Sequence, residues 1–217
     1  MQGAAFAGQP FIRLLMELAE ELRDSARTGD LLCRASYLLA LFTEVYRSGA
    51  IWPGSLLSQA TKRTKVGELL AMVPAGAVED LQALLVVARA ALVPAILARG
   101  GPLHLGPVFD GSSLVSADAD IIAGGLLLDV KTTVGTKRSD GSRYDGLDRK
   151  TLYQLLGYVL FDFSDTYAIT DIGLYAARYG RFTTWPVAEV VTELTDDGAT
   201  LAELRRRCEE TLRALAM

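Results

Sequence analysis

Cysteine and histidine are scarce in this chain, and their scarcity excludes several kinds of site. The 217 residues include two cysteines, Cys33 and Cys208, and one histidine, His104. Two cysteines cannot form a disulfide framework or a four-cysteine zinc site, so we expect a reduced compartment. A Ser/His/Asp hydrolase is not expected either, because His104 is the only available base and no Gly-x-Ser-x-Gly turn is present.

Long apolar runs and charge of one sign are also limited. The longest apolar run, residues 84–98, is interrupted by Arg89 and Pro94 and is too short to span a bilayer, so we interpret it as a buried helix. No basic start followed by an apolar stretch marks a targeting segment. We therefore expect a cytoplasmic protein without a membrane partner. Half of the residues are hydrophobic and the net charge is −4, which is typical of a folded globular chain.

The pattern of apolar residues changes near residue 100. Helical spacing dominates before that point, and short apolar segments separated by glycine follow it. The predicted class is α/β, with a mixed sheet core over residues 101–217 and a helical region over residues 1–100 packed on it, as one compact domain overall. The predicted helices are 11–23, 31–47, 65–72, 78–98, 147–163 and 201–217; the predicted strands are 107–114, 119–123, 126–134, 167–177 and 181–187; residues 135–145 are predicted to be a mobile loop.

The most informative segment is an Asp-x-Lys sequence that follows three leucines. Asp129 and Lys131 are two residues apart on a predicted strand, so their side chains face the same side. The leucines predict that this strand is buried, and charges at the end of a buried strand need partners or a function. A cross-strand ion pair between Asp118 and Lys131, with solvated aspartates beside it, is the simplest structural alternative.

A two-residue turn before this strand determines which acids meet. A turn at Gly124-Gly125 places Asp120 opposite Asp129 and Asp118 opposite Lys131. Facing carboxylates repel each other unless a cation lies between them, and Mg²⁺ (or Mn²⁺) is the expected hard cation. A turn one residue earlier would bring Asp118 to Asp129 and make Asp118 the alternative ligand.

The next predicted helix adds two polar side chains. Gln154 and Tyr158 are four residues apart and therefore share a face. The order Asp120, then Asp129-x-Lys131, then Gln154-x-x-x-Tyr158 resembles the PD-(D/E)XK nuclease superfamily, and within it the RecB-like and CRISPR-associated exonuclease-like branch. The resemblance covers roughly residues 107–187 and implies a restriction-endonuclease-like mixed sheet flanked by helices.

The resemblance also implies a role for each of these residues. Asp120 and Asp129 would hold the metal, with the Val130 carbonyl as a further ligand. Lys131 would orient the attacking water and stabilise the charged transition state, and Gln154 and Tyr158 would position the scissile strand. A metal that acidifies water and neutralises phosphate charge makes this chemistry feasible without histidine.

Members of this branch often have an additional acid on an early helix, and some have a histidine before the first strand. Glu44 and Glu79 are the candidates for the acid and His104 for the histidine, although each also fits a simple solvated position. The four cysteines that hold an iron–sulfur cluster in some members are missing here.

Basic residues gather between the Asp-x-Lys segment and the Gln/Tyr helix. Residues 131–150 contain six Lys or Arg and three Asp, a net +3 in a chain that is acidic overall. Positive charge beside the proposed site is what a phosphate backbone requires. The candidate nucleic-acid-binding residues are Lys137, Arg138, Arg143, Tyr144, Arg149 and Lys150.

The function that the sequence favours is a Mg²⁺-dependent nuclease that hydrolyses DNA, of the kind used in repair, restriction or antiphage defence. DNA is the expected partner, together with a partner protein or a second copy of the chain. The alternative is a catalytically silent nuclease-fold module that serves as a binding or assembly subunit.

Overall fold

A computed structural model describes residues 9–24, 29–144, 148–195 and 198–216 of the chain. It divides into two compact units, Met1–Leu85 and Val86–Met217. The division lies inside helix α4 (Ala75–Arg99), whereas the sequence pattern changes near residue 100.

The first unit is helical. Helices α1 (Gln9–Asp24), α2 (Gly29–Ser48) and α3 (Val66–Met72) lie close to their predicted bounds, and a short 3-10 helix, η2 (Leu56–Gln59), precedes α3. Their apolar faces form a core that includes Leu14, Leu18, Leu38, Phe42, Leu57 and Leu69. Polar side chains satisfy the backbone at both ends of α3. Glu17 accepts a hydrogen bond from the Val66 N–H, and Arg34 donates to the carbonyls of Leu70 and Val73.

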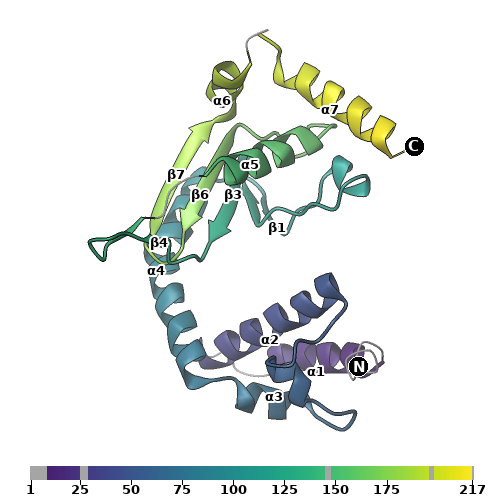
Figure 1. Cartoon of the computed structure of the whole chain (residues 1–217), viewed down its shortest axis with the longest axis vertical. Coiled ribbons are helices and arrows are strands. Elements are labelled where there is room, and N and C mark those ends of the chain that lie inside the picture. Colours follow the sequence, from purple (N-terminus) through teal and green to yellow (C-terminus); the bar gives the residue numbers. More distant parts are fainter. Residues whose placement is uncertain (1–8, 25–28, 145–147, 196–197, 217) are drawn as a thin grey trace. The chain divides into compact units, whose positions relative to one another are not determined.

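The second unit contains a five-stranded mixed sheet in the order β1-β2-β3-β6-β7 (Figure 1). Strand β3 at its centre pairs antiparallel with β2 and parallel with β6. The α/β class with a mixed sheet is therefore confirmed, and the restriction-endonuclease-like arrangement remains a prediction. The strands are β1 (Leu103–Leu105), β2 (Ile121–Ala123), β3 (Leu126–Lys131), β6 (Asp171–Ala176) and β7 (Arg181–Pro186).

Helix α5 (Arg149–Phe161) links the parallel strands β3 and β6 and packs on one face of the sheet (Figure 1). Leu155 and Val159 of α5 share a buried cluster with Leu127 of β3 and Ile172 of β6. Side chains alternate along a strand, so the face of Leu127 is also the face of Asp129 and Lys131. The Asp-x-Lys segment thus lies on the side of the sheet that α5 covers.

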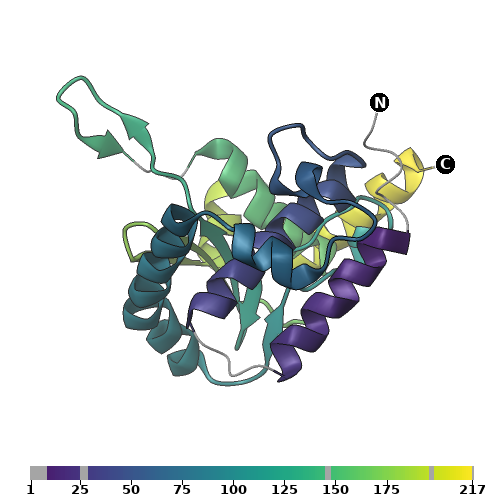
Figure 2. The same ribbon diagram turned by 90° about the horizontal axis from the view of Figure 1, so that it is seen from below.

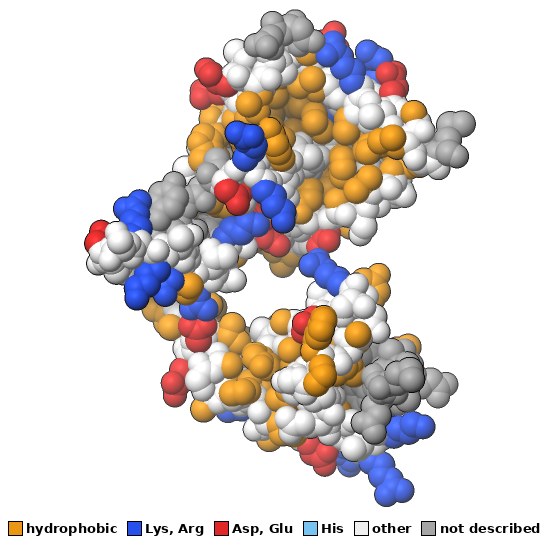
Figure 3. Space-filling view, viewed as in Figure 1, with side chains coloured by type: hydrophobic (Ala, Val, Ile, Leu, Met, Phe, Trp, Pro, Cys, Tyr) orange, Lys and Arg blue, Asp and Glu red, His pale blue; other side chains and the backbone are white. Residues whose placement is uncertain are grey.

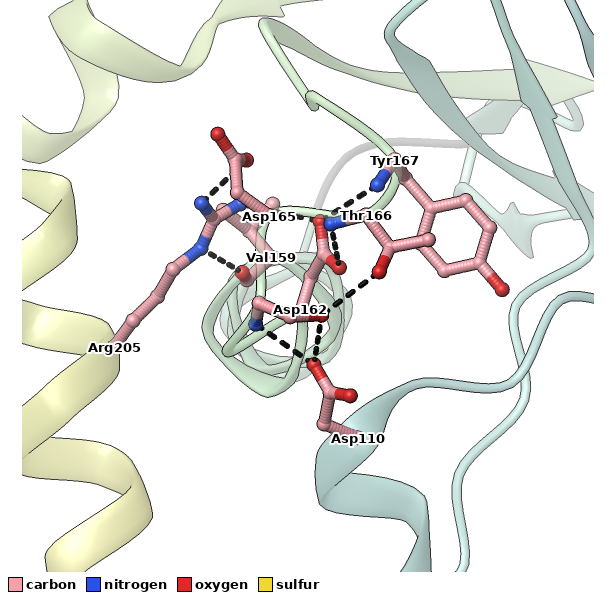
Figure 4. Close-up of polar contacts among 8 residues, drawn as sticks. Asp110, Val159, Asp162, Asp165, Thr166, Tyr167 and Arg205 are labelled. Atoms are coloured by element: carbon pink, nitrogen blue, oxygen red, sulfur yellow. Dashed lines mark hydrogen bonds and ion pairs between the residues drawn. The ribbon is translucent and has the colours of Figure 1, made fainter.

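Helix α6 (Val187–Leu194) follows β7, and helix α7 (Leu201–Leu215) packs on α5. Arg205 attaches α7 to the end of α5, where it donates to the Val159 carbonyl and to Asp165 and lies 3.4 Å from Asp162 (Figure 4). Asp162, which is 1% exposed, also accepts hydrogen bonds from the N–H groups of Thr166 and Tyr167. This buried network holds together the carboxyl end of α5, the following loop and α7.

The glycine turn between β2 and β3 confirms the first of the two registers considered from sequence. Gly124 and Gly125 both have positive φ, at 49° and 79°, and Ala123 pairs with Leu126. Continuing this register brings Asp120 opposite Asp129. The alternative turn, which would have brought Asp118 to Asp129, is wrong.

Two local predictions are also wrong. Residues 107–114 are not a strand, because they hold an isolated bridge at Val108 and a 3-10 helix, η3 (Asp110–Ser113). Ser112 stabilises this turn by accepting from the Phe109 N–H and donating to the Ala117 carbonyl. Residues 135–145 are not simply a mobile loop, because β4 (Thr136–Lys137) and β5 (Arg143–Tyr144) form a small antiparallel hairpin within the described part of that segment.

Helix α4 is not the buried helix that its apolar run predicts. In the segment 84–98, one side is partly covered and the other is solvent-exposed, with Val86 67% and Leu97 74% exposed. Within the second unit, the turn at Gly180 lies against Val87 and Ala91 of this helix, and Arg99 at its end pairs with Asp171 of β6. By length and composition α4 would also suffice to cross a membrane, a property shared with core helices of many proteins, so it does not discriminate between these settings.

Candidate active site

The polar cluster at the end of β3 contains four of the five residues that the sequence singles out as catalytic. Lys131 Nζ lies 2.8 Å from Asp129 Oδ2 and 3.4 Å from Gln154 Oε1. The Gln154 amide nitrogen is 2.8 Å from the Tyr158 hydroxyl and 3.4 Å from Asp129 Oδ1. The β3 strand and the α5 helix therefore bring Asp129, Lys131, Gln154 and Tyr158 into one network.

The chemistry of these groups fixes the orientation of the Gln154 amide. A carboxylate only accepts hydrogen bonds and an ammonium group only donates them. The amide nitrogen must therefore face Asp129 and the amide oxygen must face Lys131, as observed. Gln154 thus contacts the carboxylate and the ammonium group at once.

Asp129 is the most deeply buried acid of this cluster, at 4% exposure. Its Oδ2 has no hydrogen-bond partner among the described residues, because the nearby Lys131 ammonium forms an ion pair at a suitable distance but without hydrogen-bond geometry. A buried carboxylate oxygen without a hydrogen bond is costly. It is a suitable donor atom for a hard cation.

Asp120 precedes β2 and approaches β3 from the edge. Its Oδ2 accepts a hydrogen bond of 2.7 Å from the Val130 N–H. Burial of the carboxyl group raises the pKa of Asp120, and the charges of Asp129 and Asp118 raise it further, against the opposing effects of Val130 and Lys131. The residue as a whole is exposed, so this burial concerns the carboxylate turned toward β3. Asp120 and Asp129 are therefore close enough to repel each other.

The Val130 carbonyl lies on the same strand edge as Asp120. The N–H and C=O of one strand residue point to the same neighbour, and the Val130 N–H points to Asp120. The next residue, Lys131, directs its carbonyl the opposite way, to the N–H of Ala177. Asp120, Asp129 and the Val130 carbonyl would provide oxygen donors of the kind that Mg²⁺ or Mn²⁺ takes, which is the metal predicted from the sequence.

Within the described ranges, no three His, Cys, Asp or Glu side chains come together as a metal site. The candidate site thus offers two carboxylates and a backbone carbonyl rather than a complete side-chain cage. Mg²⁺ usually keeps several waters and binds through one or two carboxylates, so this donor set suits it. Asp118 lies in an isolated bridge with Val108 and acts on Asp120 through its charge.

The other residues predicted from sequence have different positions. Glu44 on α2 and Glu79 on α4 belong to the first unit. His104 lies on β1, and its ring packs edge-on against Tyr167, at 5.1 Å between centroids. Arg149 and Lys150 are exposed at the start of α5, and Lys137, Arg138 and Arg143 lie on the hairpin. The side chain of Tyr144 is outside the described residues.

Sequence reasoning missed Phe109. Its ring stacks on that of Tyr158, with centroids 5.6 Å apart and planes 17° apart, and it also meets Tyr167 edge-on. The contact fixes the tyrosine whose hydroxyl supports Gln154. No local signal marks Phe109, because its position depends on the η3 turn that the sequence pattern did not predict.

The comparisons with known proteins do not extend this picture. No family model, curated protein or solved structure matches the chain. The resemblance to the PD-(D/E)XK superfamily therefore rests on the order of the residues described above.

Proposed function

We propose that the chain is a metal-dependent nuclease that hydrolyses phosphodiester bonds of DNA. The observation that carries the proposal is the network of Asp129, Lys131 and Gln154, in which the buried Asp129 carboxylate lies 2.8 Å from the Lys131 ammonium group and the register places Asp120 opposite Asp129. Burying an acid at a strand end, beside a partly exposed lysine, is costly unless the pair has a function. In hydrolysis of a phosphodiester bond, a carboxylate can bind a metal ion and an ammonium group can stabilise negative charge on the phosphate.

Asp120, Asp129 and the Val130 carbonyl would hold Mg²⁺, which when bound acidifies water and neutralises charge on phosphate oxygens. Lys131 has three N–H donors, so it can contact Asp129 and Gln154 and still donate to a water or a phosphate oxygen. Its positive charge would stabilise the negative charge that develops on the phosphate. Tyr158 and Gln154 keep Lys131 and Asp129 in place, which limits the reorganisation that the reaction requires.

A second candidate is the silent nuclease-fold module. The observation that favours it is the ion pair between Lys131 and Asp129, because a self-neutralised pair is complete without a metal. The module would then bind nucleic acid or another protein without cutting. The two candidates differ in one measurable property, cleavage that requires a divalent metal.

The test is cleavage of linear and circular DNA, each single- and double-stranded, with Mg²⁺, with Mn²⁺ and with EDTA. The wild type is compared with an Asp129→Ala/Lys131→Ala variant. Its matched control is Arg206→Ala/Glu210→Ala, which also removes one base and one acid but from an exposed ion pair on α7. We expect metal-dependent cleavage by the wild type and the control and none by the site variant. Inert wild type on all four substrates would leave the silent module as the better account.

A further inference from the structure

The β4–β5 hairpin projects from the five-stranded sheet beside the candidate site (Figure 2). It begins a few residues after Lys131 and ends shortly before α5. In the chain it therefore lies between β3 and α5, the two elements that carry the residues of the candidate site. Its base is fixed to the β6–β7 turn, because Arg178 donates to the Thr132 carbonyl and the Tyr179 hydroxyl to the Val134 carbonyl. The strands pair only with one another, as a separate two-stranded sheet.

The hairpin has one unusual charge relationship. Lys137 and Arg143 are directly opposite in the register, so their side chains leave the same face of the ribbon. Like charges directly opposite are destabilising unless an anion lies near them. The acid at the tip, Asp140, instead accepts hydrogen bonds from the N–H and hydroxyl of Ser142, which lower its pKa and keep it in the turn.

Lys and Arg side chains are the main charged groups on the surface of this projection (Figure 3). Both Lys137 and Arg143 are exposed, and the Arg143 guanidinium donates to the Gly135 carbonyl, which directs it toward the base of the hairpin. Within the described part of the hairpin, no acidic side chain forms an ion pair with either residue. Such a face is complementary to a polyanion.

We propose that the β4–β5 hairpin is a basic ribbon that enters the major groove of double-stranded DNA and holds the duplex against the candidate site. The inference rests on the proposed function and specifies its substrate class. Lys137 and Arg143 would contact phosphates or base edges within the groove. The position of the hairpin between β3 and α5 would then place the adjoining backbone beside Asp129 and Lys131.

The dimensions of the ribbon fit this groove. A B-DNA major groove is about 12 Å wide and about 8.5 Å deep and admits a two-stranded ribbon, whereas the minor groove is about 6 Å wide. At ~3.3 Å per residue, the extended stretch from Thr136 to Arg138 spans roughly 7 Å, and the turn and the long Lys and Arg side chains extend the reach of the ribbon further. The major groove of A-form RNA is too narrow and deep for side chains to read, so the ribbon favours DNA.

The composition of the ribbon argues against a single-stranded substrate. Binding of single strands without sequence preference relies on aromatic side chains on which bases stack. Residues 136–143 contain none, and Tyr144 is the only aromatic residue of the hairpin. A basic ribbon without a stacking platform is better suited to a regular duplex.

The test measures binding without cleavage, by fluorescence anisotropy in EDTA, with the full chain. The probes are a DNA duplex of about two helical turns, the RNA duplex of the same sequence, and one DNA strand. The variant is Lys137→Ala/Arg143→Ala, and the matched control is Arg206→Ala/Arg213→Ala, which removes two exposed positive charges from α7. Circular dichroism confirms that both variants are folded.

We expect the hairpin variant to bind the DNA duplex about tenfold more weakly and with a shallower salt dependence, by about two in the logarithmic slope. The control should bind the duplex as the wild type does, and the RNA duplex and single strand should be affected less than about twofold by the hairpin variant. Equal losses on all three probes, equal losses in the control, or unchanged duplex binding would overturn the inference. Because no cleavage is measured, this failure is separate from failure of the proposed nuclease activity.

Discussion

Lys131 and Asp129 lie two residues apart on one strand, and the ammonium nitrogen of the lysine is 2.8 Å from Oδ2 of the aspartate. The strand pleat places both side chains on the face covered by α5, where Gln154 contacts each of them. A lysine and an acid held in this way differ from a surface ion pair, because the aspartate is almost completely buried. Removal of either residue would therefore leave the other charge without its partner.

The role of Gln154 can be tested by its removal. Gln154→Ala removes the amide that contacts both Asp129 and Lys131, so we expect metal-dependent cleavage to slow by about 10- to 100-fold while the fold is retained. Tyr153→Ala, on the exposed side of the same helix, is the control and should cleave normally. Single-turnover rates with the metal in excess make the comparison. A Gln154→Ala rate equal to that of the control would remove Gln154 from the site.

The raised pKa of Asp120 predicts that its ionised carboxylate lowers the stability of the fold in the absence of a metal. A carboxyl group whose folded pKa is raised above its usual 3.8 costs stability as the pH rises from 3.8 through the folded value, and the loss persists at neutral pH. Asp120→Asn should therefore have a higher Tm than the wild type in EDTA at pH 7, and this advantage should shrink below pH 3.8.

Mg²⁺ should reverse the order of the Tm values of the wild type and Asp120→Asn. A ligand that binds only the folded state raises Tm, so Mg²⁺ should raise Tm for the wild type and not for Asp120→Asn. Asp118→Asn is the control and should keep the Mg²⁺ response, because the Gly124-Gly125 turn brings Asp120 to β3. Thermal scans with and without Mg²⁺ measure this. A Mg²⁺ response that survives in Asp120→Asn but is lost in Asp118→Asn would assign the metal to Asp118.

Arg205 provides a prediction for stability alone. Arg205→Met leaves the buried Asp162 without its cationic partner and should lower the free energy of unfolding by about 3 kcal/mol at pH 7. Burial already raises the pKa of Asp162 and Arg205 opposes this, so the variant should raise it further. The deficit should thus grow as the pH rises from 3.8 through the folded pKa and be smaller in acid.

Urea unfolding of Arg205→Met at several pH values measures this deficit. Arg206→Met is the matched control, since Arg206 forms an exposed pair with Glu210 on the same helix and should change stability by less than about 1 kcal/mol. A deficit for Arg205→Met that does not depend on pH would show that lost packing, rather than the charge of Asp162, explains it.

The turn that aligns Asp120 with Asp129 is tested by Gly124→Ala. A Cβ at this position would lie 2.3 Å from the Gly100 carbonyl oxygen and 2.9 Å from that of Arg99, and φ is +49°. We expect a loss of about 2–4 kcal/mol of stability. Gly141→Ala has a similarly positive φ of +83° but open space around it, so it should cost about 1 kcal/mol. Equal losses would mean that the close approach does not constrain the turn.

The sequence predicts well those parts of the fold that local rules determine. Paired glycines specify a tight hairpin, and strand alternation then places Asp120, Asp129 and Lys131. Helical spacing likewise brings Gln154 and Tyr158 to one face of α5. The part of the candidate site that depends on a turn and two periodicities could therefore be predicted.

Other parts depend on contacts that no local pattern encodes. Helix α6 is different, because its apolar residues Val187, Val190, Val191 and Leu194 do have helical spacing although the segment is not among the predicted helices. Phe109 reaches Tyr158 only because Ser112 and Asp110 hold the η3 turn, and Asp110 does so through Ser164, more than fifty residues away. Arg205 and Asp162 are also distant in sequence, 43 residues apart, and each looks like an ordinary surface charge until the fold buries it.

The central claim is that Lys131 and the two aspartates perform metal-dependent hydrolysis. The most direct test is the rate of cleavage of linear duplex DNA as Mg²⁺ is titrated, for the wild type, Lys131→Met and Asp129→Asn. We predict saturable Mg²⁺ dependence for the wild type, a rate at least about 100-fold lower for Lys131→Met, and no cleavage by Asp129→Asn. Cleavage by Asp129→Asn at the wild-type rate, or none by the wild type at any Mg²⁺ concentration, would contradict the account.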